Sequence, residues 1–262
     1  MSFELNRVCP GVTHIRDAMG VCMTLIEGEK AALLMDTGYG TEDVAAFIST
    51  LTDKPLTVLL THHHHDHALG TRWFDKTVMF QEDMAEWPVF TGMEKRRVVL
   101  GQALSKGLSV TEEAFLDGEC AMPYAIHSGA LDLGGLAVEV IHCPGHTPGS
   151  CVVHVPQRKL LLTGDDWNPC TWLFFDAALP VCKYRENVCK LQKLDFEYVL
   201  CSHQLECFPR AKFDTFVENL TDDVLDAAKP VTIGGWEHVD TRQADVTDGQ
   251  ILVFDWNKYR KE

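Results

Sequence analysis

Short apolar runs separated by turn residues dominate the first sixty positions of the chain. They predict strands at 11–17, 21–29, 30–40 and 55–62. Between the last two, residues 41–52 place apolar side chains at helical spacing, with Thr41 as the expected N-cap and acidic residues in the first turn. The order strand, helix, strand is typical of a βαβ unit, in which both strands run parallel.

The remaining two thirds of the chain continue this mixture. Residues 82–108 look mostly helical, with interruptions at Pro88 and Gly92, and further helices are expected at 184–194 and 210–228. Strand patterns occur at 125–129, 131–135, 136–145, 151–166, 196–203 and 250–256. Because no internal repeat, long linker or low-complexity tract divides the chain, we expect one α/β domain over residues 1–262, with strands and helices in layers.

Composition and charge restrict the class of protein. Hydrophobic residues make up 46% of the chain, which is ordinary for a protein with a sizeable core, and no apolar run approaches the roughly 20 residues that span a bilayer. The first residues show neither a basic start nor an apolar signal core, so we expect a cytoplasmic protein that does not bind membranes. The net charge of −15 repels phosphate backbones and disfavours nucleic-acid partners. A homo-oligomer is compatible with these features.

The ten cysteines do not form a disulfide or zinc-knuckle pattern. No CxxC pair occurs, and Cys22, Cys151 and Cys201 lie inside apolar strand-like runs, where a reduced thiol behaves as a small hydrophobe. We therefore expect reduced, mostly structural thiols.

The stretch "LLTHHHHDHALG" at 59–70 places five histidines and an aspartate directly after an apolar strand. His62 and His64 are two residues apart, so in extended chain they project to the same side. As the chain turns, Asp66 and His67 come to face a neighbouring position, whereas His63 and His65 alternate away. The pattern is therefore read as His-x-His-x-Asp-His rather than as a solvated polar loop.

Three more side chains that bind metals stand at strand ends. His146 lies in the turn "CPGHTPGS", Asp165 follows the strand in "LLLTGDDW", and His203 follows the strand in "YVLCSHQLE". Loops at strand ends commonly converge on one edge of a sheet, so these side chains are candidates for one shared site. Asp166 is the alternative to Asp165.

Together these motifs resemble the metallo-β-lactamase superfamily. "LLMDTG", "HHHHDH", "CPGHTPGS", "LLLTGDD" and "YVLCSH" match its motifs in order and spacing over residues 8–205. The resemblance implies a four-layered αβ/βα sandwich with a metal site at one edge. It also implies two adjacent metals, with residues distributed as follows: His62, His64 and His146 on the first; Asp66, His67 and His203 on the second; Asp165 bridging both.

The same resemblance assigns roles around these ligands. Asp66 and Asp165 are the carboxylates expected to take part in catalysis, and Asp36 of "DTG" supports the site through hydrogen bonds. Imidazole and carboxylate ligands without a thiolate suit Zn²⁺, two per chain, although Fe or Mn also fits such a set. Two metals about 3.5–4 Å apart activate a bridging hydroxide for attack on the substrate.

Within the family, the features favour the glyoxalase II and lactonase-like branches. The true β-lactamases carry a cysteine where this chain has Asp165. The aromatic segment 167–185 predicts an apolar pocket wall, with Trp172, Phe174 and Tyr184 as substrate-binding candidates, although core packing explains the aromatic residues equally well. Lactonases often carry a tyrosine near the place where Asn168 stands here.

The expected function is hydrolysis of a small ester, thioester or lactone by a metal-bridging hydroxide. The alternative is a mononuclear iron enzyme that resembles persulfide dioxygenases and acts on a thiol. The sequence does not identify the exact substrate, the general acid or the native metal.

Overall fold

The computed structural model describes residues 3–259. Two sheets pack face to face in it, because apolar side chains alternate along the strands and gather on the facing sides. The first sheet has the order β1-β2-β3-β4-β5-β6-β7. Its strands are antiparallel from β1 to β4 and parallel from β4 to β7. They are β1 Glu4–Cys9, β2 Val12–Arg16, β3 Cys22–Glu27, β4 Ala32–Met35, β5 Leu56–Leu59, β6 Val78–Phe80 and β7 Tyr124–Ile126.

The second sheet has the order β14-β13-β11-β10-β9-β8, and only its β11–β13 pair is parallel. Its strands are β8 Gly129–Asp132, β9 Ala137–His142, β10 Cys151–Val155, β11 Leu160–Leu162, β13 Tyr198–Leu200 and β14 Phe208–Pro209. Val153 and Leu162 pack against Leu33 and Leu59 of the first sheet. Val152 and Leu161 point the opposite way, as the two-residue period of a strand requires.

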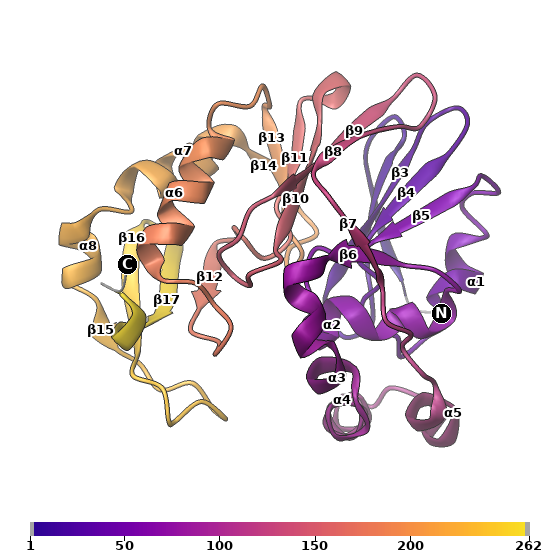
Figure 1. The fold of residues 1–262 in the computed structure, drawn as a ribbon, viewed down its shortest axis with the longest axis horizontal. Coiled ribbons are helices and arrows are strands. Elements are labelled where there is room, and N and C mark those ends of the chain that lie inside the picture. Colours follow the sequence, from indigo (N-terminus) through magenta and orange to yellow (C-terminus); the bar gives the residue numbers. More distant parts are fainter. Residues whose placement is uncertain (1–2, 260–262) are drawn as a thin grey trace.

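Helices cover the outer faces of both sheets (Figure 1). Val44 and Ile48 of α1 pack on the outer face of the first sheet. On the second sheet, Val188 of α6 and Phe213 of α7 pack over Val152 and Leu161. The helices are α1 Val44–Ile48, α2 His65–Ala68, α3 Trp87–Thr91, α4 Met93–Ser105, α5 Glu112–Asp117, α6 Val181–Leu191, α7 Arg210–Asn219 and α8 Asp222–Asp226. The predicted α/β sandwich is confirmed.

A third sheet lies beyond α6 and α7, at the end of the molecule opposite the first sheet (Figure 1), and of its strands the sequence indicated only the one at 250–256. Its order is β12-β17-β16-β15, with β12 parallel to β17. The strands are β12 Cys170–Leu173, β15 Lys229–Pro230, β16 Thr241–Thr247 and β17 Gln250–Asp255. Its Leu252 and Phe254 share one core with α6 and α7. That continuity supports the single-domain interpretation, which stays a prediction.

Several element boundaries differ from those expected. The helix expected at 41–52 is shorter, and its N-cap is Asp43 rather than Thr41, because the Asp43 side chain accepts a hydrogen bond from Ala46 N at 2.9 Å. Gly92 separates α3 from α4, whereas Pro88 lies in the first turn of α3, where its missing N–H costs nothing. The segment 151–166 forms the two antiparallel strands β10 and β11 rather than one strand.

All ten cysteines are free, as expected. Among residues 3–259, no helix is both long and apolar enough to cross a bilayer. The cytoplasmic location stays a prediction.

The core shared by the third sheet and the helices can be tested by truncation. Phe254 is fully buried, so Phe254→Ala should lower the free energy of unfolding by about 3–5 kcal/mol in chemical denaturation. Tyr198→Ala removes a ring that is 50% exposed and serves as the matched control, with less than half that effect. An effect of Phe254→Ala as small as that expected of Tyr198→Ala would show that the third sheet is not part of the folding core.

Candidate metal centre

The polar motifs lie where neighbouring strands end, so they meet at one edge of the two sheets. The His62–His67 segment follows β5, Asp165 follows β11, and His203 follows β13. The turn that carries His146 joins β9 to β10. Since β11 and β13 are parallel neighbours, Asp165 and His203 leave the second sheet side by side.

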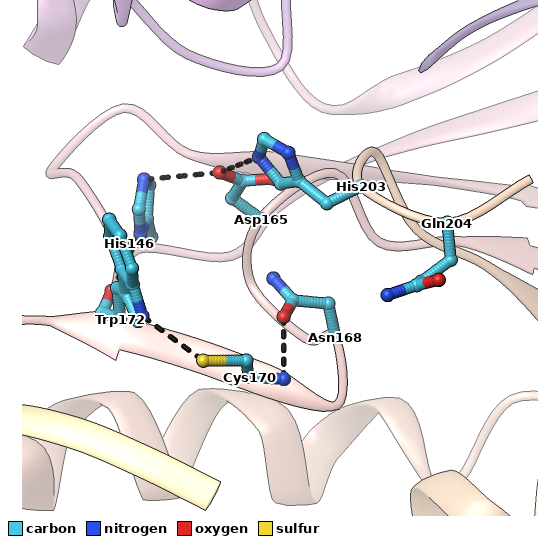
Figure 2. Close-up of a pocket in the computed structure, with 7 residues that line it drawn as sticks. All are labelled: His146, Asp165, Asn168, Cys170, Trp172, His203 and Gln204. Atoms are coloured by element: carbon cyan, nitrogen blue, oxygen red, sulfur yellow. Dashed lines mark hydrogen bonds and ion pairs between the residues drawn. The ribbon is translucent and has the colours of Figure 1, made fainter. Parts of the chain in front are cut away.

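The side chains gather in two groups. His62, His64 and His146 offer ligand atoms within 4.8 Å of one another, and Asp66, His67, Asp165 and His203 do the same. Asp165 lies between the groups, because its Oδ2 is 3.0 Å from His203 Nε2 and 3.7 Å from His146 Nε2 (Figure 2). The same oxygen is 3.5 Å from His67 Nε2. The structure therefore brings together all seven side chains that the sequence singled out.

The residues present fit a divalent cation. His62 Nε2, His67 Nε2 and Asp165 Oδ1 are buried and have no hydrogen-bond partner within the described residues. Leaving such atoms unpaired is costly unless they bind something else. Imidazole nitrogens and carboxylate oxygens are also the ligands of zinc and of neighbouring transition metals.

Asp36 orients ligands in both groups. It has a positive φ of 64°, a conformation that aspartate tolerates better than most residues. Its carboxylate accepts hydrogen bonds from Thr61 N at 2.7 Å, from Thr61 Oγ1 at 2.9 Å and from His67 Nδ1 at 2.9 Å. Thr61 Oγ1 in turn lies 2.9 Å from His62 Nδ1. With Nδ1 of each ring engaged, Nε2 of His62 and His67 is left free for a metal.

The Asp83 carboxylate connects two loops that carry ligand candidates through hydrogen bonds. It is fully buried and lies three residues beyond the end of β6. Its carboxylate accepts hydrogen bonds from His63 N at 3.1 Å, from Thr147 Oγ1 at 2.7 Å and from Gly149 N at 2.5 Å. A Cβ at Gly149 would lie 2.6 Å from Asp83 Cγ, so only glycine fits there. Asp83 thereby joins the loop of His62 and His64 to the loop of His146.

The middle histidines of the run are not among the seven. His63 is fully buried, and its Nδ1 lies 3.0 Å from Asp83 Oδ2. His65 is partly exposed at the start of α2. Asp166, the alternative to Asp165, is buried and accepts a hydrogen bond from His146 N at 3.3 Å. Its carboxylate belongs to neither ligand group.

Electrostatics differ between the two groups. Burial, together with the neighbouring imidazoles, holds the pKa of His62 and His64 well below the ordinary histidine value. Burial would raise the pKa of Asp165, but the facing His203 and His67 hold it well below its usual range. Burial also opposes a charge on His67, yet Asp165, Asp66 and Asp36 raise its pKa well above the ordinary value. The first group is therefore a set of neutral imidazoles, and the second pairs imidazoles with carboxylates.

The third sheet and the N-terminal strands support the ligands from outside. His146 Nδ1 donates to the backbone oxygen of Trp172 on β12 at 2.7 Å, which turns His146 Nε2 toward Asp165. The loop of His203 is held by His14, whose Nε2 lies 3.0 Å from Gln204 O, and by Cys22 N, which donates to Ser202 O at 2.7 Å. Burial lowers the pKa of His14 to about 4, so this contact uses a neutral ring.

A pocket of about 190 Å³ opens beside the second ligand group. It is lined by His146, Asp165, Asn168, Cys170, Trp172, His203 and Gln204 (Figure 2). Trp172 is 39% exposed and forms part of this wall, where substrate contact was expected. Phe174 and Tyr184 are fully buried, and the Tyr184 hydroxyl donates to Asp166 O at 2.6 Å. Core packing therefore holds both side chains away from the pocket, contrary to the expectation that they bind substrate.

A sequence-family model, that of the Metallo-beta-lactamase superfamily, matches residues 17–86 and 126–203 of this chain. These ranges contain all seven ligand candidates, Asp36 and Asp83. The chain belongs to the metallo-beta-lactamase superfamily. The superfamily match leaves out β1, β2, α3 to α5, most of β7 and every element after β13, whereas β12 lies inside it.

Among curated superfamily relatives, a probable metallo-hydrolase, YqgX of Bacillus subtilis, is 26% identical over 141 residues, which are 51% of this chain and 59% of that protein. The acyl-coenzyme A thioesterase MBLAC2 of Bos taurus is 27% identical over 172 residues, which are 55% of this chain and 60% of that protein. The matched region thus spans about 60% of the length of either relative. At family level, these relatives are hydrolases.

Among solved structures, a metallo-beta-lactamase from Pontibacter korlensis superposes with a TM-score of 0.57 at 17% identity. The match covers 84% of this chain and all of that one. At such low identity the likeness shows the metallo-beta-lactamase fold alone.

Two residues near the ligand candidates, Asp83 and Phe90, were not expected from the sequence, whereas Phe175 belongs to the aromatic segment expected to form the pocket wall. Asp83 lies in a segment read as helical, and only recognition of β6 as a parallel neighbour of β5 would have marked it as another strand-end residue. Phe90 and Phe175 flank the first group, with ring centroids 4.7 Å and 4.5 Å from that of His64. Aromatic residues carry no comparable signal, because most of them pack in cores.

The two carboxylates that orient ligands should affect metal binding differently. Asp83 contacts His63, between His62 and His64, and the turn of His146, so Asp83→Asn should weaken chiefly one of two metal-binding steps, by about 10- to 100-fold. Asp36 contacts His67 directly and His62 through Thr61, so Asp36→Asn should weaken both steps by similar factors. Competition of the metal-stripped protein with a chelating indicator measures each step.

Asp53 is exposed and lies just before β5, away from the ligand candidates that follow this strand. Asp53→Asn is therefore the matched control and should leave both steps unchanged. Equal weakening of both steps by Asp83→Asn would contradict a local role for Asp83. Such a result would show that it stabilises the whole edge of the sheets.

Proposed function

We propose that this chain is a metal-dependent hydrolase of a small ester, thioester or lactone. The observation that carries the proposal is the position of Asp165. Its carboxylate lies within 3.0–3.7 Å of histidines from both ligand groups and also lines the pocket. A substrate in that pocket would therefore lie next to the atoms that hold the metals.

The proposed cofactor is two Zn²⁺ per chain. His62, His64 and His146 would hold one ion, Asp66, His67 and His203 the other, and Asp165 both. When bound, the ions would activate water as a nucleophile and polarise the attacked carbonyl group. Fe or Mn would suit the same ligands.

The protein's own contribution is orientation and charge. Asp36 and the Trp172 carbonyl accept hydrogen bonds from the Nδ1 atoms of His67 and His146, which fixes the direction of each ring. Because His203 and His67 keep the pKa of Asp165 low, its carboxylate is ionised at neutral pH and can serve as an anionic bridge. Asp66, whose pKa is lowered by His67 and His65 in spite of burial, supplies the second negative charge.

The pocket and the relatives favour acyl substrates. Trp172 gives the wall an apolar surface, which suits the acyl chain of an ester or thioester. The thioesterase relative acts on an acyl-coenzyme A, by its name, which supports a thioester among the candidates. Asp165 stands where the true β-lactamases carry a cysteine, which disfavours β-lactams.

The alternative, a mononuclear iron dioxygenase acting on a thiol, requires one metal. Two complete ligand groups, each of three or four side chains, favour two ions over one. Metal analysis of the purified protein separates the two, since about two zinc ions per chain indicate hydrolysis and one iron with oxygen uptake indicates the dioxygenase.

A hydrolysis screen with the zinc-loaded protein over esters, thioesters, lactones, phosphodiesters and β-lactams tests the proposal. We expect turnover of at least one acyl substrate, its loss on chelation and its return with zinc. Asp165→Asn preserves the shape of the side chain but removes its charge, so it should lower kcat by about 100-fold or more. The exposed Asp53→Asn should retain the original rate. Turnover confined to phosphodiesters, or full activity of Asp165→Asn, would refute the proposal.

A further inference from the structure

The ring of His64 lacks the hydrogen bond that orients its neighbours. His62, His67 and His146 each have a hydrogen bond at Nδ1, which leaves Nε2 for a metal. In His64, by contrast, Nδ1 lies 2.9 Å from Nε2 of His146 and therefore faces the first ligand group. Its Nε2 is buried and has no hydrogen-bond partner within residues 3–259. Another kind of contact must fix the direction of this ring.

Two phenylalanine rings pack against His64. The ring centroid of Phe90 lies 4.7 Å from that of His64, with 36° between the ring planes. The centroid of Phe175 lies 4.5 Å from that of His64, at 62°, and 5.2 Å from that of His146. Contacts at these distances restrict rotation of the imidazole by packing rather than by a hydrogen bond.

The same two rings close the first ligand group off from solvent. Its histidines, His62, His64 and His146, are at most 4% exposed. Among them only His146 lines the pocket, which opens beside the second group. Phe90 and Phe175 are themselves half-buried, so each stands between His64 and the surface. An apolar shell of this kind controls how easily solvent reaches a metal.

Each phenylalanine is supported by a part of the chain that the superfamily model does not match. Phe90 belongs to α3, whose buried Trp87 donates a hydrogen bond from Nε1 to Cys120 O at 3.1 Å. The ring of Phe175 packs on Trp236, with 5.2 Å between centroids, in the loop between β15 and β16. The matched ranges contain neither α3 nor this loop. The superfamily motif thus supplies the histidine, and parts outside the match support its packing.

We propose that Phe90 and Phe175 are positioning residues of the first metal site, which hold the ring of His64 and slow the exchange of its metal with solvent. This inference rests on the proposed hydrolase function, because it presupposes the two metal ions. Loss of either ring gives the imidazole room to turn and opens a path for water. Zinc should therefore leave the first group faster, and bind it less tightly, once a ring is removed.

Zinc release from the loaded full chain to a chelating indicator measures this effect. Release should occur in two phases, and the phase that His62→Ala removes belongs to the first group. Phe90→Ala should make that phase about tenfold faster or more and leave the other within about twofold of the parent. Phe175→Ala should act on the same phase and tests the claim on a second ring. Phe90→Tyr keeps a ring against His64 and should retain parental rates.

A phenylalanine on α1 offers the matched control, Phe47→Ala. Phe47 is half-buried like Phe90, but it packs on the outer face of the first sheet and stacks on Phe3, with 4.2 Å between centroids. Its removal should lower the melting temperature and leave both release phases as in the parent. Both variants lose a half-buried aromatic contact, so only an effect on His64 distinguishes them.

Failure of this inference and failure of the proposed function give different results. An unchanged first-group phase in both Phe90→Ala and Phe175→Ala would overturn the role of the rings and leave the hydrolase function intact. Equal acceleration of both phases, or the same acceleration in Phe47→Ala, would do so as well. Fewer than two zinc ions on the parent chain, with no substrate of the hydrolysis screen consumed, would overturn the proposed function and this inference with it.

Discussion

The carboxylate of Asp36 ties the ligand loop after β5 to the end of β4. One of its contacts reaches His67 directly, and another reaches His62 through the hydroxyl of Thr61. Both ligand groups therefore take their orientation from a single buried side chain. The pairing of β4 with β5 as parallel neighbours makes this contact available, since both strands end at the same edge of the sheet.

The remaining ligands are held by the packing of the second sheet against the first. Asp165 and His203 leave parallel neighbours, and Asp83 joins the loop of His146 to the loop of the histidine run. The position of each ligand candidate thus follows from strand order, and the ring directions of His62, His67 and His146 follow from hydrogen bonds to Nδ1. Sheet topology and local hydrogen bonds together therefore determine the arrangement of these side chains at one edge of the sheets.

The third sheet connects the superfamily core to the pocket. β12 lies inside the region that matches the superfamily, but its partner β17 lies outside it. Through this pairing, a part of the chain outside the matched region supports Asn168, Trp172 and the contact to His146. One strand, β12, thus both lines the pocket and holds the ring of His146, a ligand candidate.

The sequence predicted the features that depend on local pattern. The alternation of apolar runs predicted most strands, and the residues directly after them supplied the seven ligand candidates. It did not reveal β1, β6, β12, β14, β15 or β16, because these strands have few residues or a mixed polar pattern and are stabilised by their partners. The pocket assignments for Phe174 and Tyr184 failed for a related reason. Whether an aromatic side chain faces a core or a cavity depends on packing between distant segments.

The central claim is that the seven side chains form two adjacent metal sites that share Asp165. A crystal structure of the zinc-loaded protein, with anomalous data on either side of the zinc absorption edge, tests it most directly. We expect two anomalous peaks about 3.5–4 Å apart, with one among His62, His64 and His146 and the other among Asp66, His67 and His203. One peak alone, or two peaks without Asp165 between them, would contradict it.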